Sequence, residues 1–362
     1  MTDESYIQLA IEIAKKGKGS VSPDPLVGCV IVKDDRILSA GFFEKHGGPH
    51  AELNAINSSN DGLIGSTMFI NLEPCWKGDG NPSCVAEIIK NKITRVVIGT
   101  LDMNPQNSGK GIKQLKAAGI EVKAGVLENE CVELNKFFFK FVTKKLPYIT
   151  LKATQTIDGK IADSHRNSRW MSSISARRFA HSLRAKYDAV LIGSRTAEID
   201  NPKLTVSLTE GRNPKRILID AELVLSTKLK LFQRNPDRNL IVLTSESSKE
   251  KKIKLSKLRK LGAEVIFVQS EGRNKINLRS ALKKLAESGI TSVIVEGGSG
   301  LFTSFVKENL FDDILLFQSP RLLGTGLSLI GPLGIKSIKN AFKLKINSFE
   351  KIGEELLVEF RK

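Results

Sequence analysis

Short apolar strand patterns alternate with helical patterns along almost the whole chain, and this alternation constrains the fold more than any other feature. In the N-terminal third, three strand-like segments, "VGCVIV" (27–32), "TMFINLEP" (67–74) and "RVVIGTLD" (95–102), are separated by helical patterns. Strands that alternate with helices form parallel or mixed sheets with helices packed on their faces. The sequence therefore predicts a layered α/β domain, with "ILSAGFF" as a hairpin partner of the first strand.

A second block of the same kind follows a basic cluster and Pro147. Its strand-like segments include "AVLIGSRT", "KRILID", "NLIVLTS", "AEVIFVQ", "SVIVEGG" and "DILLFQSP". A chain of 362 residues is too long for one ordinary domain core. We therefore expect two α/β domains, residues 1–145 and 146–362, with the boundary near Leu146.

Several classes of protein are disfavoured by the sequence. It contains no run of about 18 apolar residues, which a transmembrane helix needs. Residues 1–5 are polar and acidic, unlike the basic start of a signal peptide. Four cysteines in so long a chain do not indicate a disulfide framework. We expect a cytoplasmic protein without a membrane partner.

The net charge of +17 indicates either an anionic partner or a lysine-rich solvated surface. Much of the excess is scattered lysine, as in "SSKEKKIKLSKLRKLG" (247–262), which has the pattern of an exposed helix face. We therefore expect no nucleic-acid partner. The positive net charge is compatible with small phosphorylated ligands.

Three residues have the types and the order of a catalytic zinc site. His50 precedes a helical pattern, Cys75 closes a strand after Pro74, and Cys84 falls in the first turn of the next helix. Catalytic zinc usually takes three protein ligands and leaves one position open for water. A helix N-terminus also favours a thiolate. By contrast, Cys29 and Cys131 fall within strand and helix patterns and are expected to be buried core residues.

Glu52 is the candidate catalytic residue beside this site. It lies two positions after His50, close enough to move a proton without binding the metal. Taken alone, His50 and Glu52 do not distinguish a metal site from an ordinary helix start. Together with the two cysteines they form the H-x-E and P-C…C signature of zinc deaminases, here with eight residues between the cysteines.

At this point the sequence resembles the bifunctional deaminase–reductase family of riboflavin biosynthesis. The matching motifs run in order along nearly the whole chain: "PDPLVGCVIV", "GGPHAE", "NLEPC", "NPQNSGKG", "LNKFFF", "LKATQTIDGKIA", "SRWMSS", "ARRFAHSLRAKYDAVLIGSRT", "IDNPKLTV", "IVEGGSGL" and "SPRLLGTG". The resemblance implies a cytidine-deaminase-like three-layer α/β/α domain followed by a dihydrofolate-reductase-like α/β domain. It also implies Zn²⁺ and NADPH as cofactors, a phosphorylated aminopyrimidine substrate, and association into homo-oligomers through the reductase domain.

The same resemblance assigns roles to residues of the second domain. "EGGSG" (296–300) follows a strand, and its glycines allow a cofactor phosphate to approach the next helix. Arg184 is expected to clamp the substrate phosphate, because a guanidinium binds phosphate oxygens in pairs. The residues implied to line NADPH are Thr154, Trp170, Thr196, Asp200, Gly298 and Ser299. Those implied to line the substrate are Ser168, Arg184, Leu204, Ser207 and Glu296.

The chain departs from the family pattern at several positions that would contact substrate. The departures are Asp24 for asparagine, Phe43 for histidine, Gly80 and Asn81 for the usual Lys/Arg and threonine, and Ser207 for arginine. They spare His50, Glu52 and both cysteines. They leave open ordinary divergence, with Lys77 replacing a lost cation, as well as an altered substrate or a weakened deaminase. A nucleic-acid deaminase and a non-catalytic homologue are the competing classes, and the long reductase-like segment and the intact ligand set speak against them.

Overall fold

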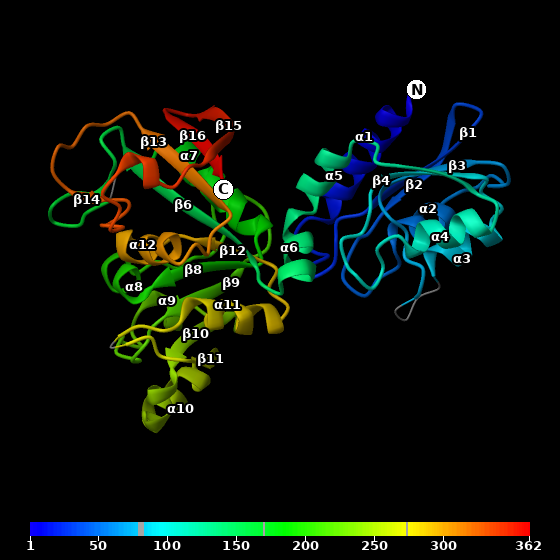
Figure 1. Ribbon diagram of the computed structural model, residues 1–362. Helices are drawn as coiled ribbons and strands as arrows, with labels where there is room; N and C mark the ends of the chain where they lie inside the picture. Colours follow the sequence, from blue (N-terminus) through cyan, green and yellow to red (C-terminus); the bar gives the residue numbers. More distant parts are fainter. Residues whose placement is uncertain (79–82, 169–170, 273) are drawn as a thin grey trace. The chain divides into compact units, whose positions relative to one another are not determined.

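Residues 1–78, 83–168, 171–272 and 274–362 are described in the computed structural model of Figure 1. The chain divides into two units, Met1–Lys145 and Leu146–Lys362, and each unit contains its own large sheet. In the described part of the chain, no helix combines the length and the apolar character needed to cross a bilayer.

The sheet of the first unit has the order β2-β1-β3-β4-β5. Its strands are β1 (Gly28–Lys33), β2 (Arg36–Phe42), β3 (Thr67–Leu72), β4 (Arg95–Thr100) and β5 (Glu121–Ala124). The predicted hairpin is confirmed, since β1 pairs antiparallel with β2. β1 also pairs antiparallel with β3, whereas β3, β4 and β5 run parallel.

Helices cover both faces of this sheet, which makes the unit a three-layer α/β/α structure (Figure 1). The helices are α1 (Asp3–Ala14), α2 (Ala51–Asn57), α3 (Cys84–Lys90), α4 (Lys110–Ala117), α5 (Glu128–Leu134) and α6 (Lys136–Lys144), with the 3-10 turn η1 (Lys15–Gly17). Alternate residues of β1 face opposite sides: Cys29 and Ile31 pack with α2, α3 and α4, and Val30 and Val32 pack with α1 and α5.

The helical run predicted over residues 128–145 is interrupted at Asn135, which separates α5 from α6. The Asn135 side chain accepts a hydrogen bond from Leu26 N–H (2.8 Å) and donates one to Leu26 C=O (3.0 Å). This tertiary contact joins two segments that lie far apart in the sequence, so local periodicity did not reveal the break.

The second unit contains a nine-stranded mixed sheet in the order β11-β10-β9-β8-β12-β6-β13-β16-β15. Its strands are β6 (Tyr148–Thr156), β8 (Ala189–Gly193), β9 (Lys215–Ile219), β10 (Leu240–Ser245), β11 (Ala263–Val268), β12 (Ser292–Val295), β13 (Asp313–Ser319), β15 (Lys345–Ile352) and β16 (Glu355–Arg361). All predicted strands of this block are present. From β11 to β13 every neighbouring pair is parallel, and the C-terminal hairpin β15–β16 adds antiparallel strands at one edge.

Helices cover this sheet on both faces, which confirms the α/β class. They are α7 (Ile174–Lys186), α8 (Ser194–Asp200), α9 (Lys230–Gln233), α10 (Lys252–Lys260), α11 (Leu278–Glu287) and α12 (Ser299–Lys307), with the 3-10 turns η2 (Glu246–Glu250) and η3 (Ile338–Asn340) and the short strands β7 (Lys160–Ala162) and β14 (Leu327–Ser328). α11 and α12 bury their apolar faces in the main core of this unit. On the opposite face, Phe179 of α7 contacts Phe317 of β13 edge to face.

Candidate functional site

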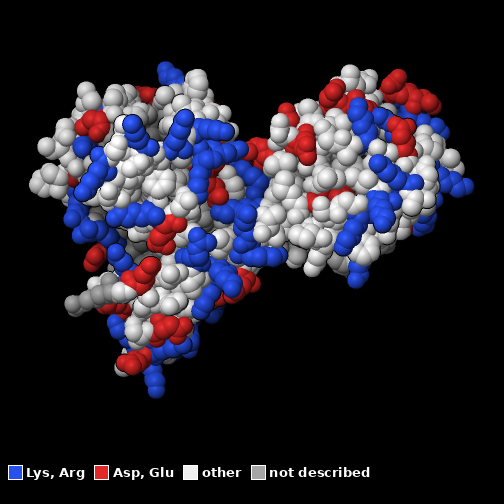
Figure 2. Space-filling model, viewed as in Figure 1, with Lys and Arg blue, Asp and Glu red and all other residues white. Residues whose placement is uncertain are grey.

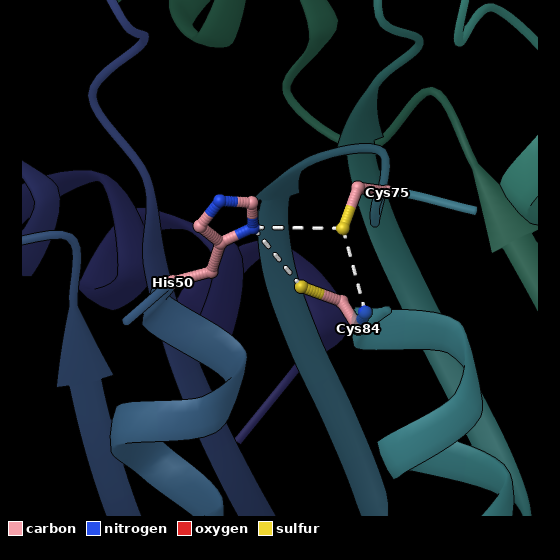
Figure 3. A group of neighbouring side chains, drawn as sticks. All are labelled: His50, Cys75 and Cys84. Carbon is pink, nitrogen blue, oxygen red and sulfur yellow. Dashed lines mark hydrogen bonds between the residues drawn. The ribbon is translucent and has the colours of Figure 1, made fainter. Parts of the chain in front are cut away.

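His50, Cys75 and Cys84 come together at one end of the first unit's sheet (Figure 3). His50 immediately precedes α2 as its N-cap residue, Cys84 is the first residue of α3, and Cys75 lies three residues beyond the end of β3. Because α2 and α3 pack side by side on the same face of the sheet, their first residues are neighbours. The imidazole and the two thiols point toward one another.

The spacing of these atoms fits a zinc ion. His50 Nδ1 lies 3.2 Å from Cys84 Sγ and 3.5 Å from Cys75 Sγ, and all three ligand atoms lie within 4.8 Å of one another. Tetrahedral zinc, with bonds of about 2.0–2.1 Å to nitrogen and about 2.3 Å to sulfur, places N and S about 3.6 Å apart. One nitrogen and two sulfurs leave the fourth position open, which is the donor set of a catalytic site.

The surroundings favour a thiolate at Cys75. Hydrogen bonds from Cys84 and His50 lower the pKa of the Cys75 thiol to about 5. The Cys84 backbone N–H, at the start of α3, also donates to Cys75 Sγ at 3.4 Å. Since zinc binds deprotonated cysteine, this polarity suits the metal.

Glu52 lies in the first turn of α2 and is 3% exposed. Burial raises the pKa of its carboxyl to about 7, and the negative charge of Cys75 acts in the same direction. A carboxyl in this range can both accept and donate a proton near neutral pH, as a general acid–base group must. The structure thus brings the predicted catalytic carboxylate and the three predicted ligands into one cluster.

A buried carboxylate that the sequence analysis missed supports the cysteine segment. Glu73 is 4% exposed and accepts hydrogen bonds from the backbone N–H groups of Asp102 (3.2 Å), Gly109 (2.9 Å), Gly111 (3.0 Å) and Ile112 (3.3 Å). These bonds tie the start of α4 and the loop before it to the residues just before Cys75. The position of Glu73 directly before Pro-Cys was the available signal.

α4 approaches this segment so closely that Gly111 has no room for a side chain. A Cβ at Gly111 would lie 2.2 Å from the Pro74 carbonyl oxygen. On the other side of Cys75, the Trp76 indole donates to Gln106 C=O at 2.9 Å, and Lys110 Nζ lies 5.0 Å from the Trp76 ring centroid. The cysteine segment is therefore held by the loop and helix that follow β4.

The departures from the family pattern are found in both units, and two of them lie outside the described residues. Phe43 is buried and meets the His50 ring edge to face, with 5.5 Å between ring centroids. Asp24 accepts a hydrogen bond from His46 Nδ1 at 2.6 Å. Gly80 and Asn81 lie outside the described residues. Phe43 thus packs against the imidazole of the predicted ligand His50, where a histidine would offer a polar atom.

The second unit contains a cavity of about 790 Å³ at the carboxyl ends of its parallel strands. Ligands of open α/β sheets bind at this edge. Seven of the residues implied by the family line the cavity: Thr154, Ser168, Thr196, Asp200, Glu296, Gly298 and Ser299. The Gly298 N–H donates to Thr196 Oγ1 at 3.1 Å, which joins α8 to the start of α12.

Arg184 is held in a way that the sequence analysis did not anticipate. Its Nε and one terminal nitrogen donate to the two carboxylate oxygens of Glu296, at 2.8 and 2.7 Å, and its other terminal nitrogen donates to Thr205 C=O at 3.2 Å. The side chains are only 15% and 12% exposed. One of the two paired edges of the guanidinium, formed by Nε and a terminal nitrogen, is therefore occupied by Glu296.

The remaining family-implied residues lie apart from the cavity walls or outside the described residues. Leu204 is buried at a positive φ of 57°. Ser207 is exposed, and its N–H donates to His181 Nδ1 at 3.0 Å. Trp170 lies outside the described residues. The roles of these residues stay predictions.

Comparisons with known proteins agree with both units. The family model "RibD C-terminal domain" matches residues 147–358, and the model "Cytidine and deoxycytidylate deaminase zinc-binding region" matches residues 1–100. The riboflavin biosynthesis protein RibD of Aquifex aeolicus is 41% identical over 99% of this chain and 98% of its own length. RibD of Escherichia coli is 31% identical over 98% of each chain.

Solved structures match over the same length. A diaminohydroxyphosphoribosylaminopyrimidine deaminase/5-amino-6-(5-phosphoribosylamino)uracil reductase from Thermotoga maritima superposes with a TM-score of 0.87 at 40% identity, covering 99% of this chain and 98% of the other. Acinetobacter baumannii RibD superposes with a TM-score of 0.88 at 30% identity, with the same coverage. With its zinc-type deaminase unit followed by a reductase unit, the chain belongs to the RibD family of bifunctional enzymes of riboflavin biosynthesis.

Proposed function

We propose that residues 1–145 deaminate 2,5-diamino-6-ribosylamino-4(3H)-pyrimidinone 5′-phosphate with zinc, and that residues 146–362 then reduce its ribosyl group to ribityl with NADPH. The observation that carries the first step is the convergence of His50, Cys75 and Cys84 beside the buried Glu52. The cavity at the carboxyl ends of the second unit's strands supports the second step. The name of the similar Thermotoga maritima protein describes both a deaminase and a reductase.

In the deaminase step Glu52 is the residue that moves protons. A zinc ion held by His50, Cys75 and Cys84 would supply Lewis acidity that makes water nucleophilic near neutral pH. Glu52 takes a proton as the water oxygen bonds to the ring carbon that carries the amine. It then gives a proton to the amine nitrogen, the C–N bond breaks, and ammonia leaves. Burial of Glu52 keeps its proton affinity high enough for both transfers.

In the reductase step the second unit positions two ligands at one edge of its sheet. Reduced nicotinamide would supply a hydride to C1′ of the ribosyl group. The C1′–O4′ bond opens, O4′ gains a proton, and a ribityl chain results. We assign Thr154, Trp170, Thr196, Asp200, Gly298 and Ser299 to the cofactor, and Ser168, Arg184, Leu204, Ser207 and Glu296 to the substrate.

The structure suggests how Arg184 and Glu296 share the substrate role. Glu296 holds the guanidinium in place and remains ionised, because Arg184 lowers the pKa of this buried carboxyl to about 2. One N–H of each terminal nitrogen of Arg184 stays available after the bonds to Glu296 and Thr205. We infer that Arg184 contacts the substrate phosphate with these N–H groups while Glu296 fixes its orientation.

A different aminopyrimidine is the second candidate substrate for the first unit. Phe43 packs against His50 where the family has a histidine, and Asp24 pairs with His46 where the family has asparagine. A nucleic-acid substrate is disfavoured, since the zinc-type unit is followed by a unit that matches the RibD C-terminal domain over residues 147–358. Figure 2 shows basic side chains over the visible face of both units, with acidic ones among them.

We propose that the chain associates with itself through the second unit and acts in the cytoplasm. β15 is an edge strand, and its Ile346 and Phe349 are 64% and 72% exposed. The register places both on the same sheet face as Val358 and Phe360 of β16. Such an apolar face is typical of a protein interface. Phe349→Glu should lower the molar mass in light scattering, whereas Ile253→Glu, at an exposed site on α10, should leave it unchanged.

Metal analysis combined with separate assays of the two half-reactions tests the main proposal. We expect one zinc per chain, ammonia release from the diaminopyrimidine phosphate, and NADPH oxidation with the deaminated intermediate. Zinc without ammonia release from this substrate would refute the substrate assignment. Ammonia release from another aminopyrimidine would instead support the second candidate.

A further inference from the structure

The cavity of the second unit extends across the ends of four neighbouring strands. Thr154 of β6, Glu296 after β12, Arg195 after β8 and Ala221 after β9 all line it. These strands are consecutive in the sheet order β9-β8-β12-β6. Strands lie about 4.8 Å apart, so three intervals give a length of about 14 Å. An elongated ligand can therefore contact different strands with its two ends.

The two ends of the cavity differ in chemistry. The β6–β12 end contains Lys152, Ser168 and Glu296, which are charged or polar. The β9 end contains a group of apolar side chains, Ile219, Ala221, Ile276 and Leu278, with the polar side chains of Glu271, Asn274 and Lys275 beside them in the lining. A flat base suits the apolar end, whereas the reacting nicotinamide must lie at the polar end, beside the substrate. This orientation rests on the proposed reductase function, and it places the adenosine of the cofactor over β8 and β9.

Arg195 lines the cavity at the end of β8, beside the stretch assigned to the adenosine. It lies in the first turn of α8, directly after β8, and its side chain is exposed at the cavity. Within the described residues its guanidinium has no hydrogen-bond or ion-pair partner. The helix turn that carries Arg195 is linked to the start of α12, because the side-chain oxygen of the next residue, Thr196, accepts a hydrogen bond from Gly298 N–H.

Two lysines, Lys275 and Lys307, also line this end of the cavity, together with the acids Glu271 and Glu308. Lys275 interacts electrostatically with Glu308, which also feels Glu271. Lys307 precedes Glu308 in the chain, and both line the cavity. Arg195, at the end of β8, differs from these lysines in its planar guanidinium, whose N–H groups make no hydrogen bond or ion pair within the described residues, as two-point phosphate recognition requires.

We propose that Arg195 binds the 2′-phosphate of the adenosine ribose and thereby selects NADPH over NADH. An arginine near the adenosine ribose is a general way to accommodate this phosphate. The 2′-phosphate is the group that distinguishes the two dinucleotides, so an arginine that contacts it affects one and spares the other. The apolar slot at the β9 end then serves the adenine of either dinucleotide.

Binding of adenosine fragments to the full chain tests this inference without turnover. Adenosine 2′,5′-bisphosphate and adenosine 5′-monophosphate differ only in the 2′-phosphate, and calorimetry gives the dissociation constant of each. We expect the unaltered chain to bind the bisphosphate at least about tenfold more tightly, the size of one charge-assisted hydrogen bond. Arg195→Ala should remove this preference, Arg195→Lys should keep part of it, and Arg259→Ala on α10 should leave it unchanged.

Each outcome separates this inference from the proposed reductase function. If Arg195→Ala weakens both fragments equally, Arg195 serves a phosphate shared by both dinucleotides and the selectivity role is refuted. An undiminished preference in Arg195→Ala also refutes it, while NADPH binding by the unaltered chain would leave the reductase assignment standing. If the unaltered chain binds neither NADPH nor NADH, both the reductase assignment and the role of Arg195 fail.

Discussion

Replacing Arg184 with methionine should destabilise the second unit by about 3 kcal/mol at neutral pH. The Glu296 carboxyl has a pKa of about 2 in the folded chain against 4.5 as the reference value: burial raises the pKa, and Arg184, with smaller contributions from Lys152 and His181, lowers it by more. Each pKa unit corresponds to about 1.4 kcal/mol, so this shift corresponds to about 3 kcal/mol. The same range is typical when one partner of a buried ion pair is removed.

The pH dependence of this loss has a definite sign. The folded-state pKa of Glu296 lies below its unfolded value, so the stabilisation is complete above about pH 4.5 and is lost as pH falls toward 2. The difference between the unaltered chain and Arg184→Met should be largest near neutral pH and should shrink on acidification, because burial raises the pKa of Glu296 once its guanidinium partner is removed and the variant's carboxyl is then protonated first. A difference that grows on acidification would contradict the assignment.

Urea unfolding followed by tryptophan fluorescence provides the assay. The chain has two tryptophans, Trp76 in the first unit and Trp170 in the second, so a Trp76→Phe background reports on the second unit alone. Arg184→Met/Glu296→Met is the control, because an apolar pair of similar volume restores stability when the loss arises from an unpaired charge. If the double variant is as unstable as the single one, the cost comes from packing and the electrostatic reasoning is refuted.

Three further results are expected of the first unit. Glu52→Gln should keep one zinc per chain and abolish ammonia release without affecting NADPH oxidation; loss of zinc would instead make Glu52 a structural partner of the ligands. Removing zinc with dipicolinate should stop ammonia release and leave NADPH oxidation intact, and parallel loss of both would contradict separate sites. Gly111→Ala should destabilise this unit by about 1–3 kcal/mol, because its Cβ would meet Pro74 C=O at 2.2 Å, whereas Gly62→Ala, with nothing within 4 Å, should leave stability unchanged.

The convergence of the three predicted ligands was predictable because the local sequence places each of them at the end of a helix or strand. His50 and Cys84 both stand at helix starts, and Cys75 follows the end of a strand, so residue type and secondary structure together defined the set. The strands were predictable for the same reason. Their apolar residues are neighbours in the sequence, and alternate residues of β1 face opposite layers. Because α2 and α3 pack side by side on one face of the sheet, their first residues then lie close together.

The interactions that sequence reasoning missed join distant segments through polar groups. Arg184 and Glu296 are 112 positions apart, and each has an ordinary place in its own helix or strand end. Asn135 breaks a helical run to bond Leu26, 109 positions away. Glu73 binds backbone N–H groups, which carry no signature in the side-chain sequence. Patterns of hydrophobicity predict layers, but they do not identify which buried polar groups pair across them.

Glu52 and Glu296 show how similar burial leads to opposite chemistry. Both carboxyls are buried, yet the pKa of Glu52 is raised to about 7 and that of Glu296 is lowered to about 2. Glu52 has thiol neighbours, so burial dominates and the carboxyl holds a proton that it can exchange. Glu296 is bonded on both oxygens by Arg184, so it remains charged and cannot act as an acid near neutral pH. The roles proposed for them, proton transfer by Glu52 and orientation of Arg184 by Glu296, therefore follow from the partners that each carboxyl group meets.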